Sequence, residues 1–453
     1  MRKKPLHTAL QIVSSLNFKE ESSMKTAIHS ERILGRDVRI NNNTWTTGLN
    51  NNDLIIGPSG AGKTRGYVMP NIMQCNESMI ISDTKGSLVD ELGPLLERSG
   101  YRLIHLNFKD LGKSYGYNPM DYIRKDPETG RYREQDIMAI AETLAPVQSH
   151  DDPFWDEAAK MYLTSLISYA MECLPEEEHN LKIVSELFAQ IHTGYYRQMI
   201  KEHQKADPDS YAVQCYSLFE YNSKSEKTEA SITSILGEKL NGLLFGNAVR
   251  MYTAKKRIDF RDLAKRKTAV FLTISDMDRS MDRLVSLVYS QALQVLTDYA
   301  DTCCEGHRLP VPVRLYLDDF ATNAFIPHFQ NITSVIRSRE ISVSIILQSI
   351  TQLTALYGSS NAKTIVNNCD NLLYLGGQDV DTATFISPRI NKPVSRILSM
   401  PLDEAWLCTR GSEARRIQKY DLSTHPRYQE LQSVAAATEA AKAKEAEEVL
   451  TLQ

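Results

Sequence analysis

The run from Gly57 to Thr64 contains the residue types that bind nucleotide phosphates. Its residues are Gly57, Pro58, Ser59, Gly60, Ala61, Gly62, Lys63 and Thr64, which satisfy the pattern Gly-x-x-x-x-Gly-Lys-Ser/Thr. The glycines allow backbone amides to turn toward phosphate oxygens, Lys63 neutralises the β and γ phosphates, and the Thr64 hydroxyl can ligate Mg²⁺. The run follows a short apolar stretch and opens a helical pattern, which disfavours a chance glycine-rich turn. We therefore predict that this loop binds ATP and Mg²⁺.

Two acidic residues form the second part of the predicted site. The stretch from Arg314 to Leu317 is mostly apolar and ends in Asp318 and Asp319. A phosphate loop requires a carboxylate at the tip of another strand. We expect Asp318 in the Mg²⁺ shell and Asp319 orienting or deprotonating the attacking water. The alternative is a solvated strand end, because aspartate pairs are common at turns.

Three further residues suit the hydrolysis of a nucleotide. Gln348 ends the strand-like run 343–347 and is expected to contact the γ-phosphate or the attacking water. Taken alone, it is more often a glutamine that satisfies a strand end, but the order of motifs along the chain favours the functional interpretation. Arg337 and Arg339 precede it, and either suits an arginine finger that stabilises the transferred phosphoryl group. For each arginine, a surface ion pair is the alternative.

The pattern of apolar runs predicts the elements that carry these residues. Strands are expected at 54–56, 79–81, 103–106, 269–274, 313–317, 343–347 and 372–375. Helical patterns separate them, which is typical of an α/β protein with a mainly parallel sheet covered by helices. From about Glu134 to Arg266 the pattern is helical throughout, and this predicts an inserted all-α domain.

We accordingly expect five segments along the chain. They are an N-terminal segment at 1–48, a nucleotide-binding domain in two parts at 49–124 and 267–425, the inserted helical domain at 125–266, and a charged helical tail at 426–453. The apolar stripe from Leu284 to Tyr299 predicts a helix in the second part. The Ala-, Glu- and Lys-rich residues 435–450 predict an exposed helix in the tail.

Composition limits the classes of function. The 453 residues are 42% hydrophobic with a net charge of −4, which is typical of a soluble globular protein and disfavours a surface coated in DNA-binding charge. Any DNA contact must be local, for example at the basic clusters 255–257 and 265–267, although such clusters are usually solvated faces. Seven scattered cysteines without a Cys-x-x-Cys pair indicate neither a disulfide framework nor a zinc site. No stretch approaches roughly 18 consecutive apolar residues, so we expect no spanning helix and a cytoplasmic location.

Several blocks together resemble the type IV coupling protein family, the conjugative DNA-transfer ATPases often called TraG-like or TraD-like. All of them occur in one order along the chain. The blocks are the phosphate loop with Pro70-Asn71, the run 81–86, the turn Tyr117-Asn118-Pro119, the run 317–320, and the run 348–353 with Tyr357-Gly358.

The resemblance implies a RecA-like domain that carries an all-helical domain. It further implies a homo-hexamer that moves single- or double-stranded DNA, with its relaxase, to a type IV secretion channel. The family's motif positions are matched by Lys63, Thr64, Asp318 and Gln348, and Arg337 stands where the family's trans-acting arginine is expected.

This sequence departs from the family pattern at three points. Family members usually carry glutamate at the position of Asp319 and proline at the position of Thr84. They also usually carry N-terminal membrane helices, whereas we expect none in this sequence. The resemblance therefore implies recruitment to the cytoplasmic face of the membrane through a partner or a separate polypeptide.

Three functions therefore compete. The first is a DNA-translocating ATPase. The second is a nucleotide-dependent docking platform with weak or no hydrolysis, which the shorter side chain of Asp319 favours. The third, a P-loop kinase, is disfavoured because no acceptor-site motif is visible and the helical domain is much larger than a lid. ATPase activity measured with and without DNA separates the first two.

Overall fold

A nine-stranded sheet forms the centre of the computed structural model, which describes residues 30–434 except 149–151, 242, 244–245, 276 and 321–324. Seven neighbouring strands are parallel, and β10 and β11 extend one edge in antiparallel pairing. In sheet order the strands are β11 (Arg415–Gln418), β10 (Glu404–Thr409), β9 (Asn371–Tyr374), β3 (Asp53–Ile56), β8 (Ile341–Leu347), β7 (Val313–Leu317), β4 (Ser78–Asp83), β6 (Thr268–Thr273) and β5 (Arg102–Asn107). The predicted α/β class with a mainly parallel sheet is therefore confirmed.

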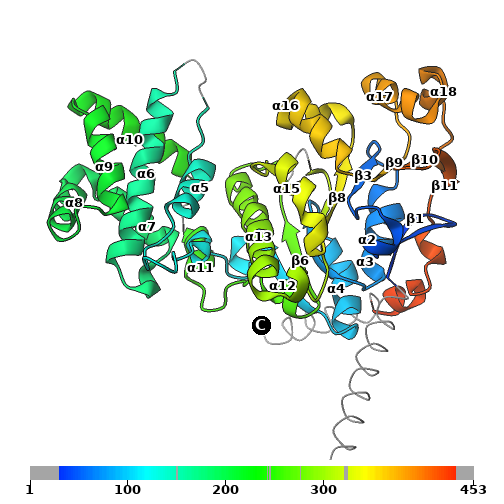
Figure 1. The fold of residues 1–453 in the computed structure, drawn as a ribbon, viewed down its shortest axis with the longest axis horizontal. Helices are drawn as coiled ribbons and strands as arrows, with labels where there is room; N and C mark the ends of the chain where they lie inside the picture. Colours follow the sequence, from blue (N-terminus) through cyan, green and yellow to red (C-terminus); the bar gives the residue numbers. More distant parts are fainter. Residues whose placement is uncertain are drawn as a thin grey trace, which may run out of the picture.

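Helices cover both faces of this sheet (Figure 1). On one face, α3 (Met69–Met73) and α4 (Leu88–Arg98) pack against alternate strand residues such as Ile55 and Ile81. On the other face, α13 (Asp282–Cys303), α15 (Phe329–Val335) and α16 (Ile350–Asn367) pack against the intervening ones. Because neither face meets water, the inner strands are buried at every position, and this explains their continuous apolar runs.

All seven predicted strands are present, with ends that differ by up to two residues, and the helix expected at 284–299 is α13. Four short strands were not predicted. Two of them, β1 (Glu31–Gly35) and β2 (Val38–Asn41), form a separate hairpin, and the other two are β10 and β11. The polar residues of β2 and β11 interrupt the apolar runs that mark buried strands, because these two strands are partly exposed, whereas β1 is buried at four of its five positions.

The helical insert, defined here as α5 to α11, leaves the sheet after β5 and returns before β6. It stands to one side of the sheet in Figure 1. Its helices are α5 (Glu134–Leu144), α6 (Phe154–Cys173), α7 (Leu181–Ala189), α8 (Tyr195–Ala206), α9 (Tyr211–Asn222), α10 (Glu226–Leu240) and α11 (Gly246–Thr253). The expected inserted helical region is therefore observed, while the domain limits at 125 and 266 remain a prediction.

The chain enters and leaves the insert at one place. Gly116 pairs with Arg257, and the amide of Ile258 donates to the Gly116 carbonyl at 2.9 Å. A Cβ on Gly116 would lie 2.5 Å from the Lys256 carbonyl oxygen, so only glycine allows the two chain segments to approach this closely.

Both predicted terminal segments fall partly outside the described residues, and of the N-terminal segment at 1–48 only residues 30–48 are described. The predicted tail at 426–453 is described only to residue 434, where 428–434 are helical, and the helix expected at 435–450 lies beyond. Within the described part of the chain, no helix combines the length and hydropathy needed to cross a lipid bilayer.

Candidate nucleotide site

The phosphate loop begins directly where β3 ends, at the carboxyl edge of the sheet. The Gly57 amide donates to the Leu347 carbonyl of the neighbouring β8 at 3.0 Å, which ties the start of the loop to the sheet. Gly60 and Gly62 have φ values of +78° and +91°, and a Cβ at either position would meet only open space. The loop is therefore an open concavity built from glycine conformations that turn backbone amides inward.

Lys63 folds across this concavity. Its ammonium donates to the carbonyl oxygens of Gly57 at 2.8 Å and Pro58 at 3.1 Å, and the residue is 8% exposed. The helical turn that follows begins at Thr64 as a π-helical segment (η1, Thr64–Val68) and continues into α3. The positive charge is therefore fixed beside the amides that would receive phosphate oxygens.

Thr64 and Asp318 provide an oxygen pair suited to Mg²⁺. The Thr64 hydroxyl donates to Asp318 Oδ2 at 3.0 Å, which connects the phosphate loop to the end of β7. Burial, and then the neighbouring Asp319, raise the pKa of Asp318 to about 6, while the Thr64 hydroxyl and the Lys63 charge oppose the shift. Hydroxyl and carboxylate oxygens are the ligands that Mg²⁺ prefers, and a cation would relieve the cost of this buried charge. These two residues therefore fit a magnesium ion.

Asp319 and Gln348 meet next to this pair. Gln348 follows β8, and its side-chain amide donates to Asp319 Oδ1 at 3.2 Å. Asp319 has a φ of +48°, a left-handed conformation that is uncommon for aspartate, and its amide donates to Asp318 Oδ1 at 3.1 Å. Because β3, β8 and β7 are adjacent in the sheet, their carboxyl ends bring Lys63, Thr64, Asp318, Asp319 and Gln348 together.

Two contacts to this site were not predicted. The Ser82 hydroxyl, near the end of β4, donates to the Asp318 carbonyl at 2.8 Å and helps to hold the turn after β7. Lys419, which follows β11, donates from Nζ to the Ala61 carbonyl of the phosphate loop at 3.0 Å. No local pattern marks Lys419, whereas Ser82 belongs to the run 81–86 that resembles the family.

Asp83, in the same run, does not face the phosphate loop. Its carboxylate accepts from the amides of Gly86 at 2.8 Å and Leu88 at 2.7 Å, which begins helix α4. Its role is thus to shape the turn that joins β4 to α4.

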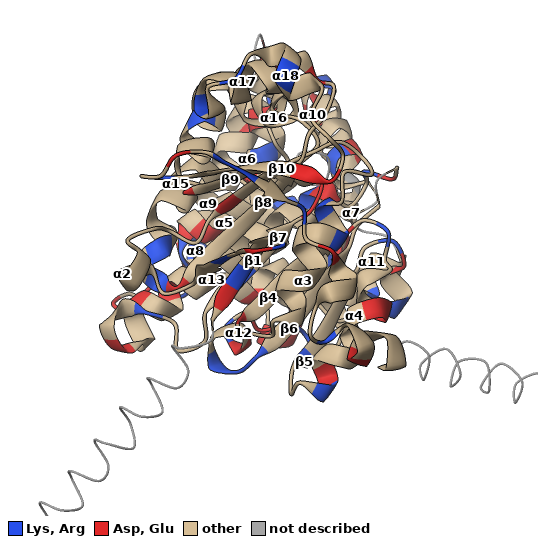
Figure 2. Ribbon diagram, turned by 90° about the vertical axis from the view of Figure 1, so that its right-hand side faces the viewer, with Lys and Arg blue, Asp and Glu red and all other residues tan. Residues whose placement is uncertain are grey.

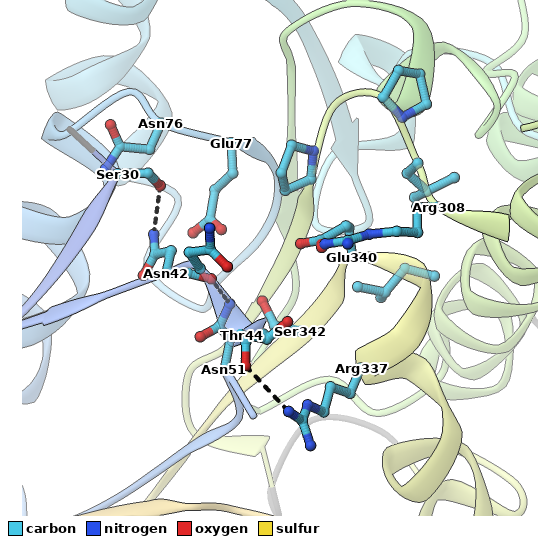
Figure 3. A pocket seen from close by; sticks show the side chains of 15 residues that line it. Ser30, Asn42, Thr44, Asn51, Asn76, Glu77, Arg308, Arg337, Glu340 and Ser342 are labelled. Carbon is cyan, nitrogen blue, oxygen red and sulfur yellow. Dashed lines mark hydrogen bonds and ion pairs between the residues drawn. The ribbon is translucent and has the colours of Figure 1, made fainter. Parts of the chain in front are cut away.

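Arg337 lies at the opposite edge of the sheet. It belongs to the short helix η7 (Ile336–Arg339) that precedes β8, and its Nη2 donates to the Thr44 carbonyl at 3.2 Å (Figure 3). The cavity beside it, about 420 Å³ in volume, is lined by residues that include Arg308 and Glu340. The seven residues of β8 separate Arg337 from Gln348 by about 20 Å, so Arg337 does not join its own chain's site.

Arg339 forms the surface ion pair that was the alternative. Its guanidinium donates to both carboxylate oxygens of Asp301, at 2.9 and 2.8 Å. The structure therefore separates the two arginines, since Arg337 makes no ion pair with an acidic residue in the described part of the chain while Arg339 does.

The basic clusters also form local contacts. Arg257 pairs with Asp121 at 2.5 Å, and Lys267 donates to the Cys75 carbonyl at 2.8 Å. On the face shown in Figure 2, lysine and arginine alternate with aspartate and glutamate. These contacts favour the interpretation of both clusters as solvated faces.

Comparisons with known proteins agree with this geometry. A family described as "Type IV secretory system Conjugative DNA transfer" matches residues 17–393. The chain is similar to Protein VirD4 of Rhizobium radiobacter, with 23% identity over 365 residues that cover 80% of this chain and 51% of the relative. The chain thus spans about half the length of the curated relatives it matches.

Solved structures with low sequence identity share the fold. The bacterial conjugative coupling protein TrwBdeltaN70, in an unbound form, superposes with a TM-score of 0.64 at 18% identity, covering 87% of this chain and 90% of that one. TrwB in complex with ADP and Mg²⁺ gives a TM-score of 0.63 at 17% identity, with 87% and 90% covered. Because the family model matches most of its length, this chain belongs to the type IV secretory system conjugative DNA transfer family.

Proposed function

We propose that this chain is an ATP-driven motor that moves DNA to a type IV secretion channel. The observation that carries the proposal is the meeting of Thr64 with Asp318, and of Gln348 with Asp319, at the edge where the phosphate loop opens. A loop that only bound phosphate would not need two carboxylates and an amide at the tips of the adjacent strands.

Each residue has a distinct role in the proposed hydrolysis of ATP. The loop amides and Lys63 hold the phosphates, and Thr64 and Asp318 hold Mg²⁺, which would supply charge neutralisation at the β and γ phosphates. Asp319 orients the attacking water and accepts its proton as the water oxygen bonds to the γ-phosphorus and the bond from that phosphorus to the ADP oxygen breaks. Gln348 holds the Asp319 carboxylate and contacts the γ-phosphate or the water.

The partners of this motor follow from its relatives. TrwB is a plasmid coupling protein, and the matched family is that of type IV secretory system conjugative DNA transfer. By similarity, we propose that the chain forms a homo-hexamer, engages single- or double-stranded DNA with its relaxase, and acts at the cytoplasmic face of the membrane through secretion-channel partners.

A nucleotide-dependent docking platform is the second candidate. Asp319 is one methylene shorter than the glutamate usual in the family, and its Oδ1 is engaged by Gln348. A carboxylate with less reach would activate water poorly, so binding of ATP without rapid turnover is the expected behaviour of such a platform.

Replacing Lys63 by alanine tests the site. We expect Lys63→Ala to abolish phosphate release from ATP, with and without single-stranded and duplex DNA, while the melting temperature stays within a few degrees, because Lys63 contacts loop carbonyls rather than the core. The control is Lys113→Ala, at a lysine whose side chain is 79% exposed and pairs with Asp110.

The results separate the candidate functions. Parental turnover in Lys63→Ala would remove the phosphate-loop assignment. ATP binding without turnover in the parent would favour the docking platform, and phosphate release without a phosphorylated acceptor excludes the kinase.

A further inference from the structure

The dipeptide Tyr357-Gly358 has no part in the nucleotide site described above. It lies within α16, which begins two residues after Gln348. Gly358 has φ and ψ of +75° and +160°, so the helix is interrupted there and consists of two pieces. This conformation is almost exclusive to glycine, and it ends the first piece at Tyr357.

The ring of Tyr357 packs against the turn that carries the site carboxylates. It stacks on Phe320, the residue after Asp319, with ring centroids 5.9 Å apart and planes 18° from parallel. Phe325 and Phe329 contact the same ring at 5.0 and 6.1 Å. Phe320 and Tyr357 are 2% and 6% exposed, so their contact lies in the protein interior, whereas Phe325 is 45% exposed.

The hydroxyl of Tyr357 also forms hydrogen bonds with the backbone of Ile326. It accepts a hydrogen bond from the Ile326 amide at 2.9 Å and donates to the Ile326 carbonyl at 3.2 Å. A single phenol thus satisfies both backbone groups of a fully buried residue, and removing it would leave both groups without these partners.

The first piece of α16 therefore connects the two halves of the hydrolytic site. At its start, the backbone amide of Gln348 donates to the side-chain oxygen Oε1 of Gln352 at 3.1 Å, which fixes Gln348 to the helix. At its end, Tyr357 contacts Phe320, which follows Asp319, and Ile326. Asp319 adopts a sparsely populated left-handed conformation, and such conformations persist only where the surroundings enforce them.

We propose that Tyr357-Gly358 is a clamp that positions Asp319 against Gln348 for hydrolysis. Tyr357 is then a positioning residue: it acts through Phe320 and Ile326 and does not touch nucleotide. The inference rests on the proposed ATPase function, because its effect on catalysis requires turnover, whereas the clamp contacts can be measured without it.

Two substitutions test the clamp in the full-length chain. Tyr357→Phe keeps the ring and removes the hydroxyl, and Gly358→Ala opposes the positive φ that ends the first helical piece. We expect each to lower kcat by about three- to tenfold, the effect of one net hydrogen bond, with an unchanged Kd for Mg-ATP. Hydrogen–deuterium exchange at the Ile326 amide should become faster in Tyr357→Phe, because the amide loses its acceptor. The matched control is Tyr252→Phe, at a buried tyrosine whose hydroxyl donates to the Leu243 carbonyl at 2.8 Å, far from the site in the insert.

Each outcome has a defined meaning. A lower kcat with intact ATP binding, absent in Tyr252→Phe, supports the clamp. Unchanged kcat despite faster Ile326 exchange, or a weaker ATP affinity with unchanged kcat, overturns the positioning role. If the parent binds ATP without hydrolysing it, the proposed function fails separately. The clamp is then judged by exchange at Phe320 and Ile326, and it is overturned if Tyr357→Ala alters neither amide.

Discussion

The two edges of the parallel sheet differ in how their buried charged side chains are arranged. Near the amino edge, Arg32 Nε lies 2.8 Å from Asp53 Oδ2, and Arg314 Nε lies 2.5 Å from Glu77 Oε1, with all four side chains at most 9% exposed. At the carboxyl edge, Asp318 and Asp319 are adjacent like charges. The nearest positive group that acts on Asp318 is Lys63, which is held by loop carbonyls.

This difference separates acids paired with arginine at the amino edge from adjacent acids at the carboxyl edge. Each buried acid at the amino edge has an arginine partner, and Asp53 also accepts from the Tyr67 hydroxyl at 2.6 Å. Such a network fixes the hairpin β1–β2, β3 and β7 in one arrangement. At the carboxyl edge, burial and the adjacent Asp319 raise the pKa of Asp318, and such shifts are common at functional sites.

The largest expected effect concerns Arg337, which would link the two edges of the sheet in neighbouring subunits. If Arg337 acts in trans, an amino-edge residue of one subunit completes the carboxyl edge of another. Arg337→Ala should lower turnover by about 10³- to 10⁵-fold while ATP still binds. Mixing inactive Arg337→Ala chains with inactive Lys63→Ala chains should restore part of the activity, because some interfaces then combine an intact finger with an intact loop.

The neighbouring Arg339→Ala, which removes the pair with Asp301, is the control and should stay near parental turnover. Turnover per chain should also rise with protein concentration. A mixture that remains inactive despite proven co-assembly would end the model of a shared site.

At the carboxyl edge, Asp319 should control the rate of hydrolysis. Asp319→Asn removes the proton acceptor and should reduce turnover by about 10²- to 10⁴-fold, trapping bound ATP. Asp319→Glu should preserve or raise turnover, because it restores the longer reach. Single-turnover assays with labelled ATP measure both, and the exposed Asp209→Asn, in the insert, is the control. Unchanged hydrolysis in Asp319→Asn would show that another group is the catalytic carboxylate.

At the amino edge, Arg314 should control stability instead. Arg314→Met leaves Glu77 without its buried cation, so we expect the free energy of unfolding to fall by about 3–5 kcal/mol. Urea denaturation measures this loss. The control, Arg261→Met, removes an exposed pair with Asp259 and should cost less than about 1 kcal/mol. Equal costs for the two variants would contradict the structural role of the network.

The smallest expected effect has the opposite sign. The folded-state pKa of Asp318, about 6, lies above its ordinary value of 3.8. Its contribution to stability is therefore fully present below pH 3.8 and is lost as the pH rises through 6. In EDTA, Asp318→Asn should raise the free energy of unfolding by about 1–3 kcal/mol at pH 7.5, with a smaller gain at pH 5. A loss of stability at pH 7.5 would mean that the protein itself compensates this charge.

Sequence reasoning recovered the parts of the fold that local patterns encode. The run 313–317 is strand β7 with the same limits, because burial on both faces leaves a continuous apolar signal even with Arg314 inside it. Lys63 and Thr64 were predicted from the phosphate-loop pattern, and Asp318, Asp319 and Gln348 from their places at strand ends; their roles remain predictions. Parallel topology then places those ends at one edge.

Other features depend on contacts between distant segments, which no local pattern contains. Lys419 reaches Ala61 across 358 positions, and Tyr357 reaches Ile326 across 31. The left-handed backbone of Asp319 is equally hidden, since no glycine marks it. The trans role of Arg337 stays a prediction, because it depends on a second subunit.

The junction at Gly116 and Arg257 makes the helical insert a closed excursion from the sheet. Because the chain returns beside the point where it left, the insert can change in length or sequence without shifting the register of β5 against β6. The insert can therefore be exchanged without altering the ends of β3, β7 and β8, where the candidate nucleotide site lies. The pairing of Gly116 with Arg257 also suggests where chimaeras could be joined: the insert of one relative could be grafted onto the sheet domain of another at these two residues.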